Sequence, residues 1–537
     1  MDDQNKNLIL AIALSSLVLL GWMYFFPPQE VPPAPEALAT ETAPTDGAVS
    51  TPSAVVAADA ATSQPTEEAS ASDAPRVSIE SNRLTGSISL QGGRIDDLAL
   101  KDYRVTIDAP EIVQFLSPVG EQGAYYALYG WAPGSGLAAA DVPGANTLWT
   151  APAGAELTPD SPVTLTWDNG AGQVFTRTIS VDDEYMFDIT QSVENTGGND
   201  LSLAPYGLIA RHGEPDVAGL YLLHEGVVRA HDGELEENNY DDMPEFDSTA
   251  EGPVSIVDVQ ENGWIGFTDK YWMTTLIPQH GQAFKSVAKY TTAQNTYRTD
   301  VRFDPMIVPA GATTEISTSF FAGAKVVDTI RDYRDSRNID NFVDSVDWGW
   351  FYFITKPMQW LLATINGIVG NMGLAIIGLT LVVKLALFPL AYKSAVSMAK
   401  MKKLQPEMAA LKEKSGNDKQ QMQKDMMKLY KDNKVNPAAG CLPILLQIPI
   451  FFSLYKVLYV TIEMYHAPFF GWIQDLSVAD SSSWINLFGL LPYDVSWAPQ
   501  VISIGIFPVL MGITMWMQQK LNPAPTDKTQ AMIFAWM

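Results

Sequence analysis

The sequence predicts a multi-domain membrane protein whose polytopic α-helical core carries a large extracytoplasmic antiparallel β-sandwich domain. Apolar runs long enough to span a bilayer occur near the start of the chain and again in its second half. Between them, residues 76 to about 325 form short runs of alternating apolar and polar side chains, separated by Gly, Asn and Asp turns. Such runs are typical of strands in an antiparallel sandwich.

Charge separates the two parts of the chain. Residues 27–345 carry 17 Lys and Arg against 48 Asp and Glu, whereas residues 391–440 carry 11 Lys against 5 acidic residues. The formal net charge of -27 therefore belongs to the β domain, and an acidic domain argues against nucleic-acid binding, which requires a basic face. The single cysteine, Cys441, excludes an intrachain disulfide and a cysteine metal cluster.

Residues 1–26 are predicted to form an N-terminal transmembrane anchor. The run 8–26 is uncharged and ends in aromatic side chains that suit a membrane interface. A cleaved signal peptide is the alternative, but the apolar run exceeds the usual ~7 to 15 residues and a basic flank is missing. Residues 27–75 are rich in Pro, Ala, Thr, Ser and Glu, so they cannot offset their ordering entropy by burial and are expected to be a disordered tether.

The β domain is expected at 76–347, where residues 326–347 form a polar helical link at its end. Residues 348–370 follow, and they mix aromatic side chains with Lys356 and Pro357. This composition favours an amphipathic helix that lies in the membrane interface rather than across the membrane.

The remaining segments follow from alternating apolar and basic stretches. We expect transmembrane helix 2 at 371–392, a cytoplasmic helical hairpin at 393–435, transmembrane helix 3 at 438–461, a periplasmic connection at 462–498, transmembrane helix 4 at 499–518, a cytoplasmic loop at 519–530 and the start of a fifth transmembrane helix at 531–537, expected to continue past Met537. The positive-inside rule places both lysine-bearing loops in the cytoplasm. Counting crossings then places the N-terminus in the cytoplasm and the β domain outside.

Lys384 is the one charged residue inside the apolar run 373–390. Burying an ammonium group in a membrane helix costs roughly 2.5 to 3.5 kcal/mol, so such a lysine is a functional-site hypothesis. Thr380 lies one helical turn earlier, on the same face. The alternative is that Lys384 reaches the inner interface with its long side chain, as we expect of Lys456 at the outer interface. Pro443 and Pro449 are expected to kink the helix that contains them, or to free backbone carbonyls that neighbouring groups must satisfy.

Methionines recur at helical spacing in the hairpin. One interpretation is ordinary packing between two helices, and the other is a pliable apolar surface for varied partners. The candidate contact residues of the hairpin are Met398, Met401, Lys402, Lys403, Met408, Met422 and Met426.

Three stretches make the chain resemble the YidC family of bacterial membrane protein insertases. They are GLTLVVKLALFPL at 378–390, SMAKMKKLQPEMAALKEK at 397–414 and LYKDNKVNPAAGCLPILLQIPIF at 429–451. In the last, the Val-Asn-Pro, Gly-Cys and Pro-x-x-x-x-Gln-x-Pro elements occur in the order seen in the family. The resemblance covers the architecture of residues 1–537 and implies a β-supersandwich for the extracytoplasmic domain.

The resemblance implies an insertase and chaperone without enzymatic activity, cofactor or metal. Its client-binding groove would be positively charged and hydrophilic, open to the cytoplasm and to lipid, closed outside, and lined by Lys384, Thr380, Gln447 and Phe451. The family commonly has arginine where this chain has Lys384, and lysine lacks the bidentate fork of arginine.

The resemblance also implies partners and a cellular location. The implied partners are nascent membrane proteins, the Sec translocon, the ribosome and signal recognition machinery, and membrane lipids, but no nucleic acid. The implied location is the bacterial inner membrane, and the implied state is a monomer.

Two other classes stay open on the residues alone. A secondary transporter also carries intramembrane charges and broken helices, but it would usually show two repeated halves, and no internal repeat is visible. A membrane-tethered periplasmic carbohydrate-active protein could use the His and carboxylates of residues 212–216 as proton carriers. No second motif supports that chemistry.

Overall fold

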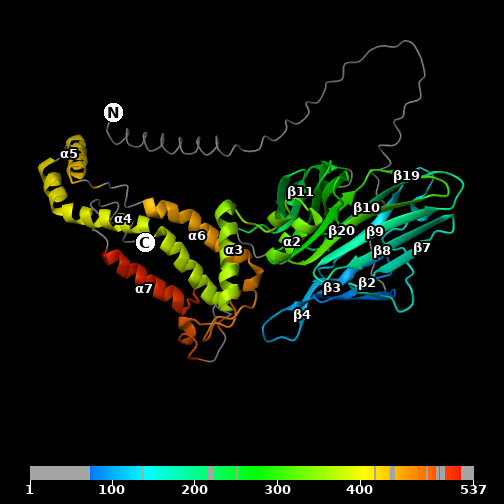
Figure 1. Cartoon of the computed structure of the whole chain (residues 1–537), viewed down its shortest axis with the longest axis horizontal. Helices are drawn as coiled ribbons and strands as arrows, with labels where there is room; N and C mark the ends of the chain where they lie inside the picture. The colour runs from blue at the N-terminus through cyan, green and yellow to red at the C-terminus, as the bar shows by residue number, and fades with distance from the viewer. Residues whose placement is uncertain are drawn as a thin grey trace, which may run out of the picture. The chain divides into compact units, whose positions relative to one another are not determined.

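The computed structural model describes residues 73–135, 137–215, 223–249, 252–415, 419–433, 442–478, 482–491 and 502–521, together with Val435 and Val495. These residues form two β-sheets followed by a set of helices (Figure 1). The anchor expected at 1–26, residues 27–72 of the expected tether, and residues 522–537 lie outside the described residues.

The larger sheet has twelve strands, and its main path runs β13-β14-β17-β18-β10-β5-β3-β2-β1-β6, with β19 paired to β10 and β4 paired to β3. Its strands are β1 (Arg76–Glu80), β2 (Leu84–Ser89), β3 (Arg94–Arg104), β4 (Ile112–Leu116), β5 (Tyr125–Pro133), β6 (Glu156–Leu157), β10 (Leu201–His212), β13 (Ser248–Thr249), β14 (Gly252–Val259), β17 (Phe284–Thr291), β18 (Thr296–Arg302) and β19 (Met306–Val308).

The smaller sheet has eight strands in the order β12-β11-β15-β16-β20-β9-β8-β7. Its strands are β7 (Val163–Asp168), β8 (Gln173–Val181), β9 (Met186–Asn195), β11 (Gly226–His231), β12 (Glu234–Asn239), β15 (Gly263–Thr268), β16 (Trp272–Pro278) and β20 (Thr313–Ala324).

The two sheets share one hydrophobic core, which is the expected sandwich arrangement. Along β8, buried and partly exposed residues alternate strictly, so one face of the strand points to the core. Aromatic contacts join the sheets, since Trp131 of β5 packs on Phe175 of β8 and Tyr125 of β5 packs on Phe267 of β15. The prediction of a large antiparallel β domain is therefore confirmed, with β1 and β6 as the one parallel strand pair recorded among the described strands.

The helical part follows the sheets along the chain. Its helices are α2 (Val327–Arg337), α3 (Tyr352–Val369), α4 (Met372–Ser415), α5 (Lys419–Asp432), α6 (Leu442–Val460) and α7 (Ile506–Leu521). Gly370 ends α3 in the left-handed conformation, with φ of 70°. Of the described helices, α4 is the one that is both long and apolar enough to cross a membrane by length and composition, and α6 and α7 contain shorter apolar stretches.

The structure differs from the expected boundaries at two places. The expected helix 371–392 and the first arm of the hairpin form one continuous helix, α4, which runs through Pro389 and Pro406. Pro443 is the second residue of α6, within the first helical turn, where backbone N–H groups have no partner in the helix. The expectation that Pro443 kinks a helix interior is therefore wrong, whereas Pro449 does lie inside α6.

Candidate functional site

Lys384 lies on an exposed face of α4. Among the described residues no carboxylate forms an ion pair with it. Thr380, one turn earlier, donates its hydroxyl to the carbonyl of Ile376 at 2.9 Å, so this polar group is satisfied within the helix. Eight residues at ~1.5 Å rise separate Lys384 from Tyr392, which places the cation ~12 Å inside the expected cytoplasmic boundary.

Gln447 and Phe451 lie four residues apart on α6, on one helix face, and both are exposed. Gln447 is five residues from the start of α6 at Leu442, which corresponds to ~8 Å along the helix axis. Lys384 therefore lies ~12 Å from the boundary expected at Tyr392, and Gln447 lies ~8 Å from the start of α6.

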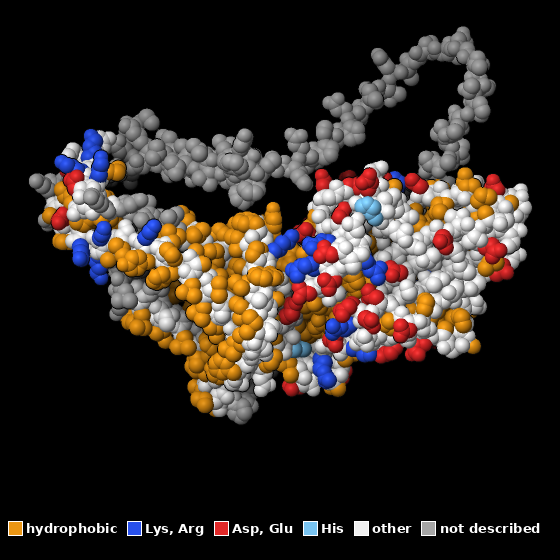
Figure 2. All heavy atoms as spheres, in the orientation of Figure 1, with side chains coloured by type: hydrophobic (Ala, Val, Ile, Leu, Met, Phe, Trp, Pro, Cys, Tyr) orange, Lys and Arg blue, Asp and Glu red, His pale blue; other side chains and the backbone are white. Residues whose placement is uncertain are grey.

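Helix α3, the start of α4 and the end of α6 pack together. Their shared core consists of Met358, Leu362, Met372, Ala375, Leu379, Val457 and Met464. Lys384 and Gln447 are absent from this core and remain accessible. Figure 2 shows that apolar side chains gather on the surface of the helices, whereas acidic side chains gather on the surface of the β domain.

The cytoplasmic hairpin expected at 393–435 is formed by the end of α4 and by α5. Its interior is built from Leu404, Met408 and Val435, with Met401, Met426, Leu429 and Tyr430 packed against them. Three of the candidate methionines thus fill the space between the helices, while Met398 and Met422 are partly exposed. Lys402 and Lys403 are exposed, so the outward surface of the hairpin is basic.

The connection after α6 holds the outer end of α4. The side-chain amide of Asn371 donates to the carbonyls of Pro468 and Phe469, at 3.3 and 3.1 Å. The Asn371 carboxamide oxygen also accepts the backbone N–H of Leu374 and so caps the first turn of α4. The ring of Phe469 lies directly over Gly373, where an added Cβ would overlap it.

Gly373→Ala should therefore loosen this outer closure. The new methyl group cannot coexist with the present position of Phe469, so the ring must leave, and we expect a stability loss of roughly 1 to 3 kcal/mol from overpacking. Thermal unfolding of the solubilised protein measures the loss. Gly367→Ala, where a Cβ meets open space, is the matched control, and equal melting temperatures for both variants would contradict the proposed contact.

From the sequence we expect the side chain of Lys456 to extend to the outer interface, but in the structure it is buried. Its side chain is 8% exposed and forms an ion pair with Asp347, whose side chain is 14% exposed. Asp347 also accepts the backbone N–H of His224 at 2.8 Å, and so joins α6 to the start of β11. The snorkelling interpretation of Lys456 is wrong because the β domain supplies a buried counter-ion at that position.

The residues that follow Lys456 continue into the β domain. Val460 and Ile462 belong to the core shared by the two sheets. Tyr465 packs edge-on against Trp272 and donates its hydroxyl to the carbonyl of Arg104 at 2.8 Å. His466 contacts the same carbonyl at 3.0 Å. We call residues 456–466 the junction segment, since it fixes the outer end of α6 to the β domain.

Lys325 lies in the same buried region, 1% exposed, and donates to Thr268 at 2.9 Å. Burial lowers its pKa from 10.5 to about 8, and the attraction of Asp269, Asp347 and Glu225 offsets that effect only in part. At pH values between about 8 and 10.5, Lys325 therefore binds fewer protons in the native state than in the unfolded state.

Native stability should consequently rise with pH between 8 and 10.5 because of Lys325. The lowered pKa corresponds to ~3 kcal/mol across the window. Denaturant unfolding at several pH values measures the rise, and it should be lost in Lys325→Met. An equal rise of stability with pH in the wild type and in the variant would mean that other titratable groups cause it.

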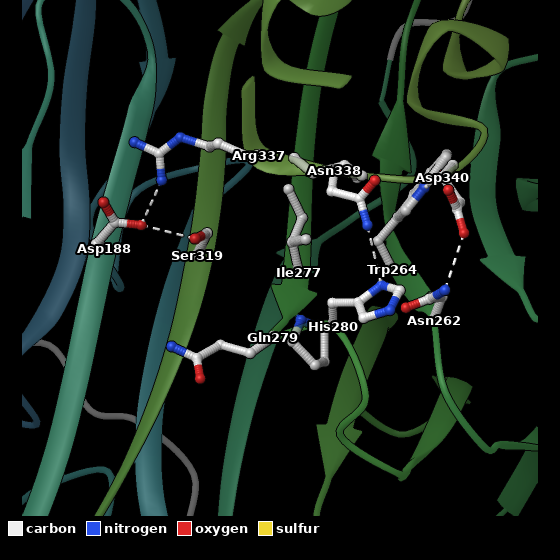
Figure 3. Close-up of a pocket in the computed structure, with 13 residues that line it drawn as sticks. Asp188, Asn262, Trp264, Ile277, Gln279, His280, Ser319, Arg337, Asn338 and Asp340 are labelled. Carbon is white, nitrogen blue, oxygen red and sulfur yellow. Dashed lines mark hydrogen bonds and ion pairs between the residues drawn. The ribbon is translucent and has the colours of Figure 1, made fainter. Parts of the chain in front are cut away.

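A pocket of about 250 Å³ lies beside the C-terminal end of α2 on the smaller sheet (Figure 3). Its polar side chains pair with one another, since Arg337 donates to Asp188 at 2.7 Å and Asn262 donates to Asp340 at 2.9 Å. His212 and Glu214 do not line it, and the ring of His212 packs near Tyr126 instead. His212 and Glu214, the residues on which the carbohydrate-active alternative depends, therefore lie outside this pocket.

Two family models together match almost all of the chain after residue 75. Residues 76–361 match the YidC periplasmic domain, and residues 364–537 match the 60Kd inner membrane protein family. This combination defines an inner-membrane protein with a periplasmic β domain.

Curated relatives named membrane protein insertase YidC agree over the full length. The protein from Ruegeria sp. is 58% identical and that from Jannaschia sp. is 55% identical, each over 100% of this chain and 90% and 91% of the relative. The chain belongs to the YidC family of membrane protein insertases, which are not enzymes.

Solved structures are similar at lower identity. A YidC insertase crystal structure with its first transmembrane domain resolved is 18% identical, with a TM-score of 0.27, and covers 82% of this chain and 88% of its own. A galactose mutarotase-like protein from Lactobacillus casei is 11% identical, with a TM-score of 0.30, and covers 46% of this chain and 100% of its own.

Proposed function

We propose that this chain inserts nascent membrane proteins through a client-binding groove lined by Lys384, Thr380, Gln447 and Phe451. The observation that supports the proposal most directly is Lys384, an exposed cation within the otherwise apolar run 373–390 of α4, together with the exposed polar side chain of Gln447 on α6. The packing of α3 against the start of α4 and the end of α6 supports the closed outer end that such a groove requires.

The groove works by electrostatic attraction and by a shortened path. A client with an acidic N-terminal tail must move that tail across the hydrocarbon layer, where an isolated charge is costly. A polar cavity that reaches inward to Lys384 shortens this crossing, and the ammonium group attracts the tail. The apolar helix of the client leaves along the exposed faces of α4 and α7. The membrane potential adds ~2.3 kcal/mol per charge per 100 mV for an acidic tail that moves outward.

The topology belongs to the proposal. In it α4, α6 and α7 cross the inner membrane, α3 lies in its outer interface, and the N-terminus is cytoplasmic. The exposed lysines of the hairpin, including Lys402 and Lys403, face the cytoplasm, where the ribosome and signal recognition machinery would meet them. Partly exposed Met398 and Met422 offer clients an apolar contact, and the Sec translocon is a further partner. The protein acts as a monomer.

Reconstitution tests the function. Proteoliposomes that contain only this chain should insert a radiolabelled single-span client, scored by protection from external protease. A secondary transporter would instead carry solutes and leave client insertion unchanged, which would contradict the proposal.

The carbohydrate-active alternative needs a different comparison. Deleting the β domain would also expose Val460 and Ile462 of the junction segment, so its effect on insertion would be ambiguous. His212→Ala with Glu214→Ala leaves the junction segment intact. Wild-type insertion in that variant supports the insertase, whereas complete loss of function would favour chemistry at those residues.

A further inference from the structure

The turn between α6 and α7, at 484–491, carries large apolar side chains on its surface. The exposed ones are Trp484, Leu487, Phe488, Leu490 and Leu491, and Leu490 is 82% exposed. Single exposed apolar residues are ordinary, but five within eight positions concentrate apolar surface on one short turn. No Asp, Glu, Lys or Arg occurs in 482–491.

The exposure belongs to an ordered turn. Asn486 is 4% exposed, and its side-chain oxygen accepts the backbone N–H groups of Ser483 and Gly489, each at 2.9 Å. Its carbonyl accepts the N–H of Leu491 at 3.0 Å. Asn486 is thus the buried centre around which the apolar side chains point outward.

Two bulky residues of the turn adopt the left-handed backbone conformation, Leu487 with φ of 51° and Phe488 with φ of 57°. This conformation costs roughly 1 to 2 kcal/mol for a residue with a Cβ. The hydrogen bonds around Asn486 maintain this conformation, although it leaves the side chains of Leu487 and Phe488 exposed. A surface of this kind gains free energy only when an apolar medium covers it.

The turn is fastened to the start of α7. The backbone N–H of Trp484 donates to the carbonyl of Ile504 at 3.1 Å, and its indole N–H donates to the carbonyl of Ile502 at 2.7 Å. On the same connection, Trp472 stacks on Phe507 of α7, with ring centroids 6.1 Å apart. Tryptophans at the end of an apolar helix are typical of the boundary between lipid headgroups and acyl chains.

We infer that the turn 484–491 is embedded in the outer leaflet of the bilayer, at the boundary between headgroups and acyl chains. The partner is therefore the lipid itself, and its apolar chains cover Leu487, Phe488 and Leu490. The connection predicted from the sequence as a periplasmic loop would in this part be a membrane contact. The inference rests on the proposed topology, in which α7 crosses the membrane from this side.

Site-specific fluorescence tests the inference. In a Cys441→Ser background, Leu490→Cys is labelled with an environment-sensitive NBD dye in the full chain, reconstituted into phosphatidylcholine and phosphatidylglycerol vesicles. Its emission should be blue-shifted, quenched several-fold by nitroxide lipids and little affected by aqueous iodide. The matched control is Ile256→Cys on β14, 51% exposed, which should show the opposite behaviour.

Two results would overturn the inference. Iodide quenching at Leu490 equal to that at Ile256 would place the turn in water. Protection from both quenchers would mean that protein covers it, either another segment of this chain or a second copy.

A second labelled position separates this inference from the topology. Met511→Cys, in the middle of α7, should be quenched by nitroxide lipids if that helix spans the membrane. Iodide quenching at both positions would contradict the topology itself, whereas iodide quenching at Leu490 alone would overturn only the lipid contact of the turn.

Discussion

Lys384→Glu should reduce insertion of clients with acidic N-terminal tails by at least about tenfold, whereas Lys384→Arg should remain near the wild-type level. At an effective dielectric constant of ~20 and a separation of ~8 Å, one charge pair is worth ~2 kcal/mol, and reversing its sign turns attraction into repulsion of similar size. Arginine keeps the charge and adds donors. Protease protection of the client in reconstituted vesicles measures the effect.

Two controls isolate the electrostatic role of Lys384. Lys393→Glu makes the same charge change on the same helix, but at its expected cytoplasmic boundary, and should have a much smaller effect. A client with a neutral tail should be inserted by Lys384→Glu nearly as well as by the wild type. Normal insertion of acidic-tailed clients by Lys384→Glu would refute the electrostatic role.

Asp347→Ala should destabilise the protein by ~3 to 5 kcal/mol, because it removes the carboxylate that forms an ion pair with the buried ammonium group of Lys456. Replacing both partners with apolar residues, as in Asp347→Leu with Lys456→Met, should recover most of that loss. The measurement is thermal unfolding in detergent, followed by intrinsic tryptophan fluorescence.

Asp344→Ala is the matched control for Asp347→Ala. Asp344 pairs with Lys356 at 2.5 Å, but both side chains are about one-third exposed, and pairs of this kind contribute ~0 to 1 kcal/mol. If Asp347→Ala and Asp344→Ala shifted the melting temperature equally, the junction segment would not depend on a buried ion pair.

The parts of the fold predicted correctly from the sequence are those set by local pattern. Alternation along β7 and β8 predicted strands, and the apolar run around Lys384 predicted a helix. The methionine stripe left two interpretations open, and Met401 and Met408 lie between the hairpin helices. Helical spacing predicts that a face is apolar, but it does not specify what covers that face.

The junction segment could not be predicted from pattern because its partners are far apart in the chain. Lys456 and Asp347 are separated by 109 positions, and an isolated lysine near the end of an apolar run looks the same whether it reaches water or a buried carboxylate. One signal was available. Asp347 precedes the aromatic run at 348, so both charges flank the same membrane boundary, with opposite signs.

The measurement that tests the central claim most directly is photo-crosslinking of a stalled nascent client to single positions of this chain. Probes at Thr380, Lys384 and Gln447 line the proposed groove, and a probe at Val382, also exposed but on the opposite face of α4, is the control. We predict client adducts at the three groove positions and few or none at 382. Adducts of equal yield at all four positions, or at 382 alone, would contradict a groove built around Lys384.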